Sequence, residues 1–261
     1  MNPELKAVVF DWAGTMIDFG SRAPMVALVK LFDAAGVPIT ESEARVDMGK
    51  AKSDHIAGIL EIPRVKDGWA ASYGKAPDEA DVARLFGDIA PMMREAAREC
   101  ATLIPGAADV VAQLRAAGIR IGSCTGYTRE MMVDILPLAE EQGYKPDLLV
   151  CAGETAFGRP SPLMLWKNLV ELGVWPATAC VKVDDAEVGI AEGRSGGVWT
   201  IGVAASGNGV GLSREAFEAL TAEERAERVG AARASLEKAG AHLVIDTVAE
   251  LPAALAKLPI G

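Results

Sequence analysis

The segment from Val8 to Asp18, which reads VVFDWAGTMID, constrains the fold more than any other part of the chain. An apolar run ends at a carboxylate, Asp11, and small residues and a glycine, Gly14, follow at once. This pattern is typical of a strand buried on both faces of a parallel sheet, with a tight loop at its carboxyl end. Ligands bind at that edge of open α/β sheets, and a glycine lets backbone N–H groups approach an anion closely. The segment therefore predicts an α/β fold with Asp11 at the ligand-binding edge.

The rest of the chain alternates between strand-like and helix-like segments. Apolar runs that predict further strands lie at 119–123, 148–151, 179–183, 198–203 and 242–246. Helical signals separate them, which implies a mainly parallel, doubly wound, Rossmann-like sheet. Residues 21–100 carry helical patterns and no strand pattern. We therefore expect an α/β core made of residues 1–20 and 101–261, with a helical domain inserted at 21–100.

The helical insert carries its own start signals. A helix is expected to begin near Pro24, because proline is favoured in the first turn. Thr40-x-x-Glu43 has the spacing of a capping box, which predicts the start of a second helix. We expect this helix to be interrupted at Gly49 and to restart at Lys52.

Three other local signals lead to expectations about single segments. Residues 78–98 predict a long helix that is broken at Pro91. Thr247-x-x-Glu250 has the spacing of a capping box and predicts a capped final helix. The glycine-rich stretch 207–211 precedes no apolar helix, so we interpret it as a flexible surface turn.

The composition narrows the functional classes. The formal net charge is −10 and no basic run interrupts it, which argues against binding to nucleic acid or to an anionic membrane. The chain has only two histidines and its cysteines form no CxxC pair, so a zinc site has little support. The first residues show no signal-peptide pattern, and no apolar run is long enough to span a membrane. We therefore expect a cytoplasmic protein with reduced thiols.

Polar residues follow four of the expected strands at the edge where ligands bind. They are Asp11, Thr125–Gly126, Arg159 and Asp184–Asp185. Two carboxylates can hold a magnesium ion through their oxygen atoms. A hydroxyl, backbone N–H groups at a helix start and a guanidinium can hold phosphate oxygens. The sequence therefore predicts a site for a phosphoryl group and Mg²⁺.

Four short motifs, DWAGT, TGY, GRP and VDD, resemble the four motifs of the haloacid dehalogenase superfamily. The helical insert resembles the cap domain of that superfamily, and the resemblance covers nearly the whole chain. It implies that Asp11 is a nucleophile that takes the phosphoryl group as an aspartyl phosphate. The ligands that it implies are Asp11, the backbone carbonyl of Ala13 and Asp185 for magnesium, and Thr125, Gly126 and Arg159 for the phosphoryl oxygens.

Ala13 stands where phosphatases of that superfamily carry the second acid of an Asp-x-Asp motif, their general acid and base. Alanine cannot transfer a proton, so the usual hydrolysis of phosphate esters is disfavoured. The insert offers another route, because Lys52 and His55 face the same way on a helix. An amine beside an imidazole can form and protonate an imine with a carbonyl substrate. Such an imine receives the electrons of a breaking P–C bond as an enamine.

Attack on a carbonyl requires a neutral amine. With an unperturbed pKa of about 10.4, roughly one lysine in a thousand is neutral near pH 7. We therefore expect burial, or nearby cations such as Lys50, to lower the pKa of Lys52.

Longer segments make the resemblance more specific. DWAGT, MGKAKSDHI, TGYTREMM, GRPSP and EGRSGGVWT resemble segments of the phosphonatase family within the superfamily. This resemblance implies hydrolysis of the P–C bond of phosphonoacetaldehyde to acetaldehyde and phosphate, in 2-aminoethylphosphonate degradation. It implies that Lys52 forms the Schiff base, that Met48 and His55 assist around it, and that Tyr127 lines the cleft. It also implies a homodimer joined through the cap domains.

A second departure from the superfamily pattern concerns the metal site. Many members place another acid four residues after the metal-binding aspartate, where this chain has Gly189. Either Asp184 supplies the third carboxylate or the ion keeps more water. We favour Asp185 as the direct ligand, with Asp184 behind it.

Two other functions are compatible with parts of the sequence. A magnesium-dependent phosphatase or phosphomutase would turn over phosphate esters with Lys52 dispensable, and Ala13 argues against it. A non-catalytic protein that binds phosphorylated metabolites would show a damaged nucleophile or metal site. The residues of that site are all present: Asp11, Thr125, Arg159 and Asp185.

Overall fold

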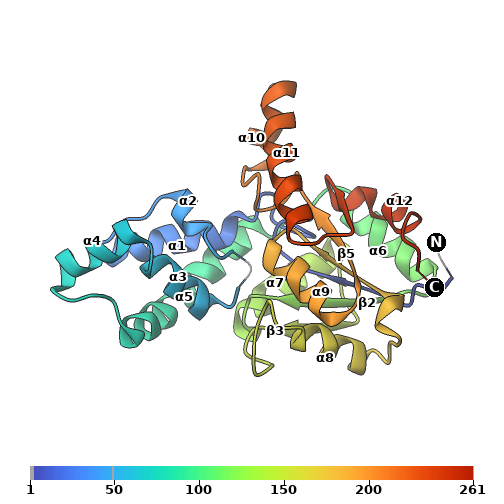
Figure 1. Ribbon diagram of the computed structural model, residues 1–261, viewed down its shortest axis with the longest axis horizontal. Helices are drawn as coiled ribbons and strands as arrows, with labels where there is room; N and C mark the ends of the chain where they lie inside the picture. Colours follow the sequence, from blue (N-terminus) through green and yellow to red (C-terminus); the bar gives the residue numbers. More distant parts are fainter. Residues whose placement is uncertain (1–2, 49, 261) are drawn as a thin grey trace.

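The computed structural model describes residues 3–48 and 50–260. Figure 1 shows the sheet at its centre. The sheet has six strands in the order β3-β2-β1-β4-β5-β6. The strands are β1 (Ala7–Phe10), β2 (Arg120–Thr125), β3 (Leu148–Cys151), β4 (Cys180–Asp184), β5 (Trp199–Val203) and β6 (Leu243–Ile245). All neighbouring strands pair in parallel, which confirms the predicted doubly wound α/β fold. β1 lies in the middle, between β2 and β4.

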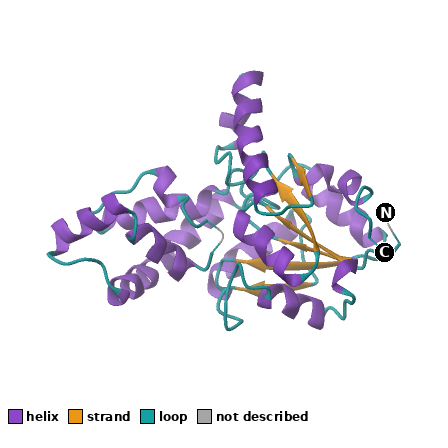
Figure 2. Ribbon diagram, in the orientation of Figure 1, coloured by secondary structure: helices purple, strands orange, loops and turns teal. Residues whose placement is uncertain are grey.

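Helices cover both faces of this sheet (Figure 2). The main ones are α6 (Ala107–Ala116), α7 (Arg129–Glu141), α8 (Leu163–Glu171), α9 (Glu187–Gly196), α11 (Ala222–Lys238) and α12 (Leu251–Leu255). Val8 and Phe10 of β1 belong to the apolar cluster that includes residues of α6 and α7, while Ala7 and Val9 pack with residues of α8. Because both faces are buried, each residue of β1 is apolar, as in other parallel sheets.

The insert after β1 is helical throughout and lies beyond one edge of the sheet, on the left in Figure 1. It contains α1 (Arg22–Ala34), α2 (Glu41–Ala44), α3 (Lys52–Leu60), α4 (Pro63–Tyr73) and α5 (Glu79–Cys100). Its core forms where α1 packs along α5 and buries Leu28, Phe32, Ile89 and Met93. This region is consistent with the expected cap.

The two chain segments that join the insert to the sheet lie side by side. The N–H of Asp18 donates to Thr102 O at 3.1 Å, and the N–H of Ile104 donates to Met16 O at 2.9 Å. The buried Asp18 carboxylate also accepts from the N–H of Ala23 at 2.8 Å, in the first turn of α1. The segments that lead into and out of the insert are therefore joined by backbone hydrogen bonds beside the loop that follows β1.

Pro91 does not break its helix, contrary to the prediction. α5 runs without interruption through it. Pro91 is exposed, so the carbonyl left without its N–H partner can be solvated, while Leu85, Ile89 and Met93 on the other face stay buried. The tertiary packing of that face outweighs the local cost of one lost hydrogen bond.

The two capping-box predictions have different outcomes. Thr40 and Glu43 form both reciprocal hydrogen bonds, although α2 is only one turn long. Thr247 caps nothing with its side chain, because a short 3₁₀ turn (Val248–Glu250) precedes α12 and takes a main-chain hydrogen bond to Thr247 O instead. α3 begins at Lys52 as predicted, and the interruption expected at Gly49 lies outside the described residues.

None of the helices within residues 3–48 and 50–260 combines the length and the apolar character needed to cross a membrane.

Candidate active site

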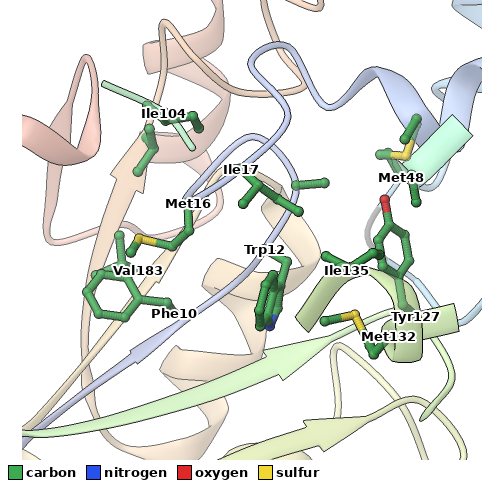
Figure 3. Close-up of a cluster of buried hydrophobic side chains, with 14 of the residues drawn as sticks. Phe10, Trp12, Met16, Ile17, Met48, Ile104, Tyr127, Met132, Ile135 and Val183 are labelled. Carbon is green, nitrogen blue, oxygen red and sulfur yellow. The ribbon is translucent and has the colours of Figure 1, made fainter. Parts of the chain in front are cut away.

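The loop after β1 places Asp11 at the carboxyl edge of the sheet. The N–H of Asp11 donates to Val183 O at 3.0 Å and so extends the ladder with β4. The chain then turns sharply, because Trp12 O accepts from the N–H groups of Thr15, Met16 and Ile17. Trp12 itself is buried and packs among Phe10, Met132 and Ile135 below this loop (Figure 3). The carboxylate therefore sits on a rigid support.

Gly14 is required where this loop meets Asp185. Its φ of +84° is a conformation that favours glycine. A Cβ at this position would lie 2.2 Å from Asp185 Oδ2, so no other residue fits without displacing that carboxylate. Asp185 Oδ2 also accepts from the N–H of Asn208 at 2.7 Å. Two backbone segments thus position Asp185 opposite Asp11.

Arg159 is held in place by buried oxygen atoms on several sides. Its Nη1 donates to Asp11 Oδ1 at 2.8 Å and its Nε donates to Glu192 Oε2 at 3.2 Å. Its Nη2 donates to Cys124 O, and Asp184 Oδ2 lies 3.5 Å from Nη1. The side chain is only 1% exposed, so the guanidinium has a single well-defined position beside Asp11.

Lys182 and Glu192 are site residues that the sequence analysis missed. Lys182 Nζ lies 3.0 Å from Asp184 Oδ2 and 3.3 Å from Glu192 Oε2, and all three side chains are fully buried. The strand sequence CVKVD could have indicated this pairing, because a lysine inside a buried apolar strand needs a charged partner nearby. The partner on α9 could not be identified without the fold.

The buried carboxylates outnumber the buried cations around Asp11. Burial and the Asp184 carboxylate raise the pKa of Asp11 to about 6, despite the opposing effect of Arg159. Burial, Asp11 and Asp184 raise the pKa of Asp185 well above its usual value. Oxygen atoms of Asp11, Asp184 and Asp185 all lie within 4.8 Å of one another. A buried set of hard oxygen donors with excess negative charge fits a divalent cation such as Mg²⁺.

The structure brings nearly all predicted site residues to one small cavity of about 30 Å³. Its predicted lining residues are Asp11, Ala13, Met48, Lys52, Thr125, Gly126, Tyr127, Arg159 and Asp185, and the lining also includes Ser21, Pro24 and Ala186, which sequence reasoning missed. These residues come from the sheet edge and from the insert. The cavity therefore lies where the two parts of the chain meet.

Thr125 and Tyr127 form the part of the cavity at the end of β2. Thr125 is buried, and its Oγ1 accepts from the N–H of Tyr127 at 3.1 Å. Figure 3 shows the Tyr127 ring directed from the core toward Met48 of the insert. Burial raises the pKa of Tyr127 well above 10, so its hydroxyl stays protonated. This wall contributes a hydroxyl group and an aromatic ring to the cavity.

Lys52 and His55 form a buried pair in the first turn of α3. His55 Nε2 lies 2.9 Å from Ala44 O and must donate to it, because a carbonyl can only accept. In the neutral ring, Nδ1 then has a free lone pair, which accepts from Lys52 Nζ at 3.3 Å. Burial, and then the charge of Lys52, lower the pKa of His55 well below 6.5. The geometry matches the predicted arrangement of an amine beside an imidazole, and the lowered pKa adds that this imidazole is neutral.

The amine of Lys52 is buried and has a lowered pKa. The residue is 3% exposed, and Nζ lies 6.0 Å from the centre of the Tyr127 ring. Burial lowers the pKa to about 8; Arg159 lowers it as well, and Asp11 opposes both effects. A second cavity of about 320 Å³, lined in part by Phe86 and Phe157, reaches Lys52 from another side. Lys52 thus lies between the inner cavity and a larger outer one.

The stretch 207–211 forms a turn as predicted, but this turn is packed against other segments and is not a free surface turn. Gly207 is buried, and the backbone of Asn208 holds Asp185 as described above. Arg45 of the insert donates to Asn208 Oδ1 at 2.8 Å and to Gly211 O at 2.8 Å. The sequence showed a glycine-rich stretch with no apolar helix directly after it. The tertiary structure packs this stretch between Arg45 of the insert and Asp185 at the edge of the sheet.

The fold and the site define a class of enzyme. A family model of haloacid dehalogenase-like hydrolases matches residues 5–197. The buried group of Asp11, Asp184 and Asp185 is typical of the magnesium site of that class. The chain is thus a haloacid dehalogenase-like hydrolase.

Similar individual proteins show to which family within this class the chain belongs. Phosphonoacetaldehyde hydrolase of Paraburkholderia xenovorans (strain LB400) is 52% identical over 247 residues, which cover 95% of this chain and 92% of that protein. The enzyme of the same name from Bacillus cereus (strain B4264) is 42% identical over 248 residues, 95% of this chain and 94% of that one. The crystal structure of a phosphonoacetaldehyde hydrolase-like protein from Oleispira antarctica matches with a TM-score of 0.96 at 43% identity, covering 97% of this chain and 92% of that one. The chain belongs to the phosphonoacetaldehyde hydrolase family.

Proposed function

We propose that this chain hydrolyses the P–C bond of phosphonoacetaldehyde to acetaldehyde and phosphate, with Lys52 as the imine-forming amine and Asp11 as the nucleophile. The observation that carries the proposal is one buried cavity lined by Asp11, Ala13 and Lys52. It combines a carboxylate able to attack phosphorus with an amine able to activate the carbonyl. A phosphatase in which Lys52 is dispensable gives no reason for burying that amine at the nucleophile.

The first step uses the Lys52–His55 pair. The neutral amine attacks the aldehyde carbon and forms a C–N bond. His55 Nδ1, 3.3 Å from Lys52 Nζ, is placed to take the proton that the amine loses. Returning this proton to the alkoxide oxygen completes the carbinolamine, and a further proton from solvent on its hydroxyl releases water and leaves a protonated imine on Lys52.

The second step breaks the P–C bond. An Asp11 oxygen attacks phosphorus, and the P–C electron pair moves to the imine, which becomes an enamine. Thr125 and Gly126 hold the phosphoryl oxygens in this proposal, and Arg159 neutralises charge as it builds. Asp11, the Ala13 carbonyl and Asp185 would hold Mg²⁺, whose positive charge would offset the negative charge of the phosphoryl group.

Water completes both halves of the reaction. Protonation of the enamine carbon regenerates an imine, and its hydrolysis releases acetaldehyde and free Lys52. A second water hydrolyses the aspartyl phosphate to phosphate and frees Asp11. Since imine formation releases one water, the net reaction consumes one.

The proposal includes the domain organisation and the assembly. Residues 1–20 and 101–261 would act as the core, with 21–100 as a cap that carries Lys52 and Met48 to the cleft. The resemblance described above also supports a homodimer joined through the caps, which sedimentation velocity would detect as a doubled mass.

Borohydride trapping with phosphonoacetaldehyde tests the imine directly. We expect peptide mass mapping to find a reduced adduct on Lys52, and the untrapped reaction to release phosphate. Inorganic phosphate alone, without an aldehyde, should give no adduct. Hydrolysis of simple phosphate esters with no adduct on any lysine would instead identify a phosphatase.

The lowered pKa of Lys52 predicts the pH dependence of its reactivity. With a pKa of about 8, the neutral fraction rises about tenfold per pH unit below 8 and levels off above it. The rate at which a small amine-directed reagent modifies Lys52 should follow this curve, and kcat/KM on the acidic side should follow it too. A modification rate that still climbs tenfold per unit up to pH 10 would show an unperturbed amine.

A further inference from the structure

Gly189 and Asp184 compete for the same space beside the cation site. Gly189 lies in the first turn of α9, and Asp184 is the last residue of β4. A Cβ at position 189 would lie 2.0 Å from Asp184 Cγ, 2.0 Å from its Oδ2 and 2.3 Å from its Oδ1. Any side chain at 189 would therefore have to enter the volume that the Asp184 carboxylate fills.

We propose that Asp184, together with Asp11 and Asp185, is the third carboxylate of the cation site. Its side chain comes from β4 and occupies a space that is free only because residue 189 is a glycine. The inference rests on the proposed function, because it concerns the same Mg²⁺ site. Asp184 is fully buried, and one of its oxygen atoms lies within 4.8 Å of oxygen atoms of both Asp11 and Asp185. Its Oδ1 accepts from the N–H of Ala186 at 3.1 Å, which fixes the carboxylate toward the start of α9.

Lys182 makes the buried position of Asp184 electrostatically possible. The two residues are two apart on β4, so their side chains project from the same face of the sheet. Lys182 Nζ lies 3.0 Å from Asp184 Oδ2 and 3.3 Å from Glu192 Oε2 on α9. A carboxylate buried between β4 and α9 without a cation beside it would carry a large desolvation cost.

A second glycine lets α9 pack against this charged pair. A Cβ at Gly193 would lie 3.0 Å from Lys182 Cβ and 2.5 Å from Thr200 Cγ2. Gly189 and Gly193 are one helical turn apart, so they share the face of α9 that meets β4. Each glycine therefore faces one member of the pair, Gly189 facing Asp184 and Gly193 facing Lys182.

The charge of the assembled site agrees with this role. Asp11, Asp184, Asp185 and Glu192 are buried carboxylates, and Lys182 and Arg159 are buried cations that form ion pairs with all of them except Asp185. When all are ionised, the carboxylates exceed the cations by two charges, which a divalent ion neutralises. Without Asp184 the excess falls to one, and the site loses part of its attraction for a divalent ion.

The proposal is tested by mutations that move the carboxylate from position 184 on β4 to position 189 on α9. The variants are Asp184→Gly, Gly189→Asp and the double variant Asp184→Gly/Gly189→Asp, in which the acid enters the same volume from α9. Binding of Mn²⁺ to the full chain is measured by electron paramagnetic resonance, and Mg²⁺ binding by the shift in unfolding temperature. No substrate is needed, so the metal site is tested apart from the P–C cleavage.

Asp184→Gly is expected to weaken Mn²⁺ binding about 10–100-fold. The double variant should recover most of that loss, while Gly189→Asp alone should lower the unfolding temperature because two side chains then share one space. Asp184→Asn keeps the shape of the side chain and removes its charge, so we expect the same weakening of Mn²⁺ binding. This variant replaces Asp184→Gly in the test if Asp184→Gly fails to fold. Glu187→Gln removes an exposed carboxylate from the first turn of the same helix and should leave binding unchanged.

Several outcomes would overturn the inference. Wild-type affinity in Asp184→Asn would show that Asp184 does not contribute to the site. A folded double variant as weak as Asp184→Gly would show that the two positions do not deliver the carboxylate to the same place. No Mn²⁺ binding by the wild-type chain would remove the proposed metal site itself, and this inference with it.

Discussion

Asp11→Asn is expected to abolish P–C bond cleavage, with kcat falling by roughly 10⁴-fold or more, as when other covalent nucleophiles are removed. An amide cannot attack phosphorus to form an acyl phosphate, whereas its carbonyl oxygen can still accept from Arg159 Nη1, which donates to Asp11 Oδ1 at 2.8 Å. The loss should therefore be chemical rather than structural. Phosphate release and the unfolding temperature, measured side by side, check both parts.

The Asp11 variant should still form the imine, because Lys52 and His55 are unchanged. Borohydride in the presence of phosphonoacetaldehyde is expected to trap the uncleaved substrate on Lys52, an adduct that keeps its phosphorus. Near-normal phosphate release by a folded Asp11→Asn protein would rule out Asp11 as the nucleophile. Absence of the phosphorus-containing adduct would contradict the order of steps, in which the imine precedes P–C cleavage.

Lys52→Arg is expected to remove activity to a similar extent for a different reason. A guanidinium stays protonated at all working pH values and cannot form an imine with an aldehyde. The positive charge near the cavity remains, so Mg²⁺ binding by Asp11 and Asp185 should change little. Three measurements distinguish a variant that cannot form the imine from one that cannot bind Mg²⁺. They are phosphate release, borohydride trapping and the Mg²⁺-induced shift in unfolding temperature.

Lys50 offers a matched control for this substitution. It lies two residues away, is about one-third exposed, and pairs with Asp47 at 2.8 Å rather than lining the inner cavity. Lys50→Arg should keep the rate within a few-fold of wild type. If Arg at 52 proves too long for its buried position, Lys52→Met removes the amine with a shorter apolar chain. Appreciable turnover by either folded Lys52 variant would rule out Lys52 as the residue that forms the Schiff base.

The order and type of the sheet elements could be predicted because their signals are local. An apolar run such as Val8–Phe10 needs cover on both faces, and parallel pairing provides it. The same rule placed Asp11, Thr125, Arg159 and Asp185 at one edge, since parallel strands present their carboxyl ends together. Local signals also set the start of α3 at Lys52.

Local signals were wrong where distant packing decides. Pro91 predicted a break that the buried face of α5 prevents, and the glycines of 207–211 predicted a free turn that is packed against Asp185. Nothing in the neighbouring sequence indicates either contact, because the partners come from segments far away along the chain. The same limit hid Glu192 as a partner of Lys182.

The sequence by itself determined the residue types on which the proposed chemistry depends: a carboxylate at Asp11, no proton donor at Ala13, and an amine beside an imidazole at Lys52 and His55. These are properties of residue types and short spacings. Only the tertiary structure decided that Lys52 meets Asp11 in one cavity, that its pKa falls to about 8, and that the Asp184 carboxylate occupies the space beside Gly189. Desolvation and close contact depend on surroundings assembled from the whole chain, and no local pattern contains them.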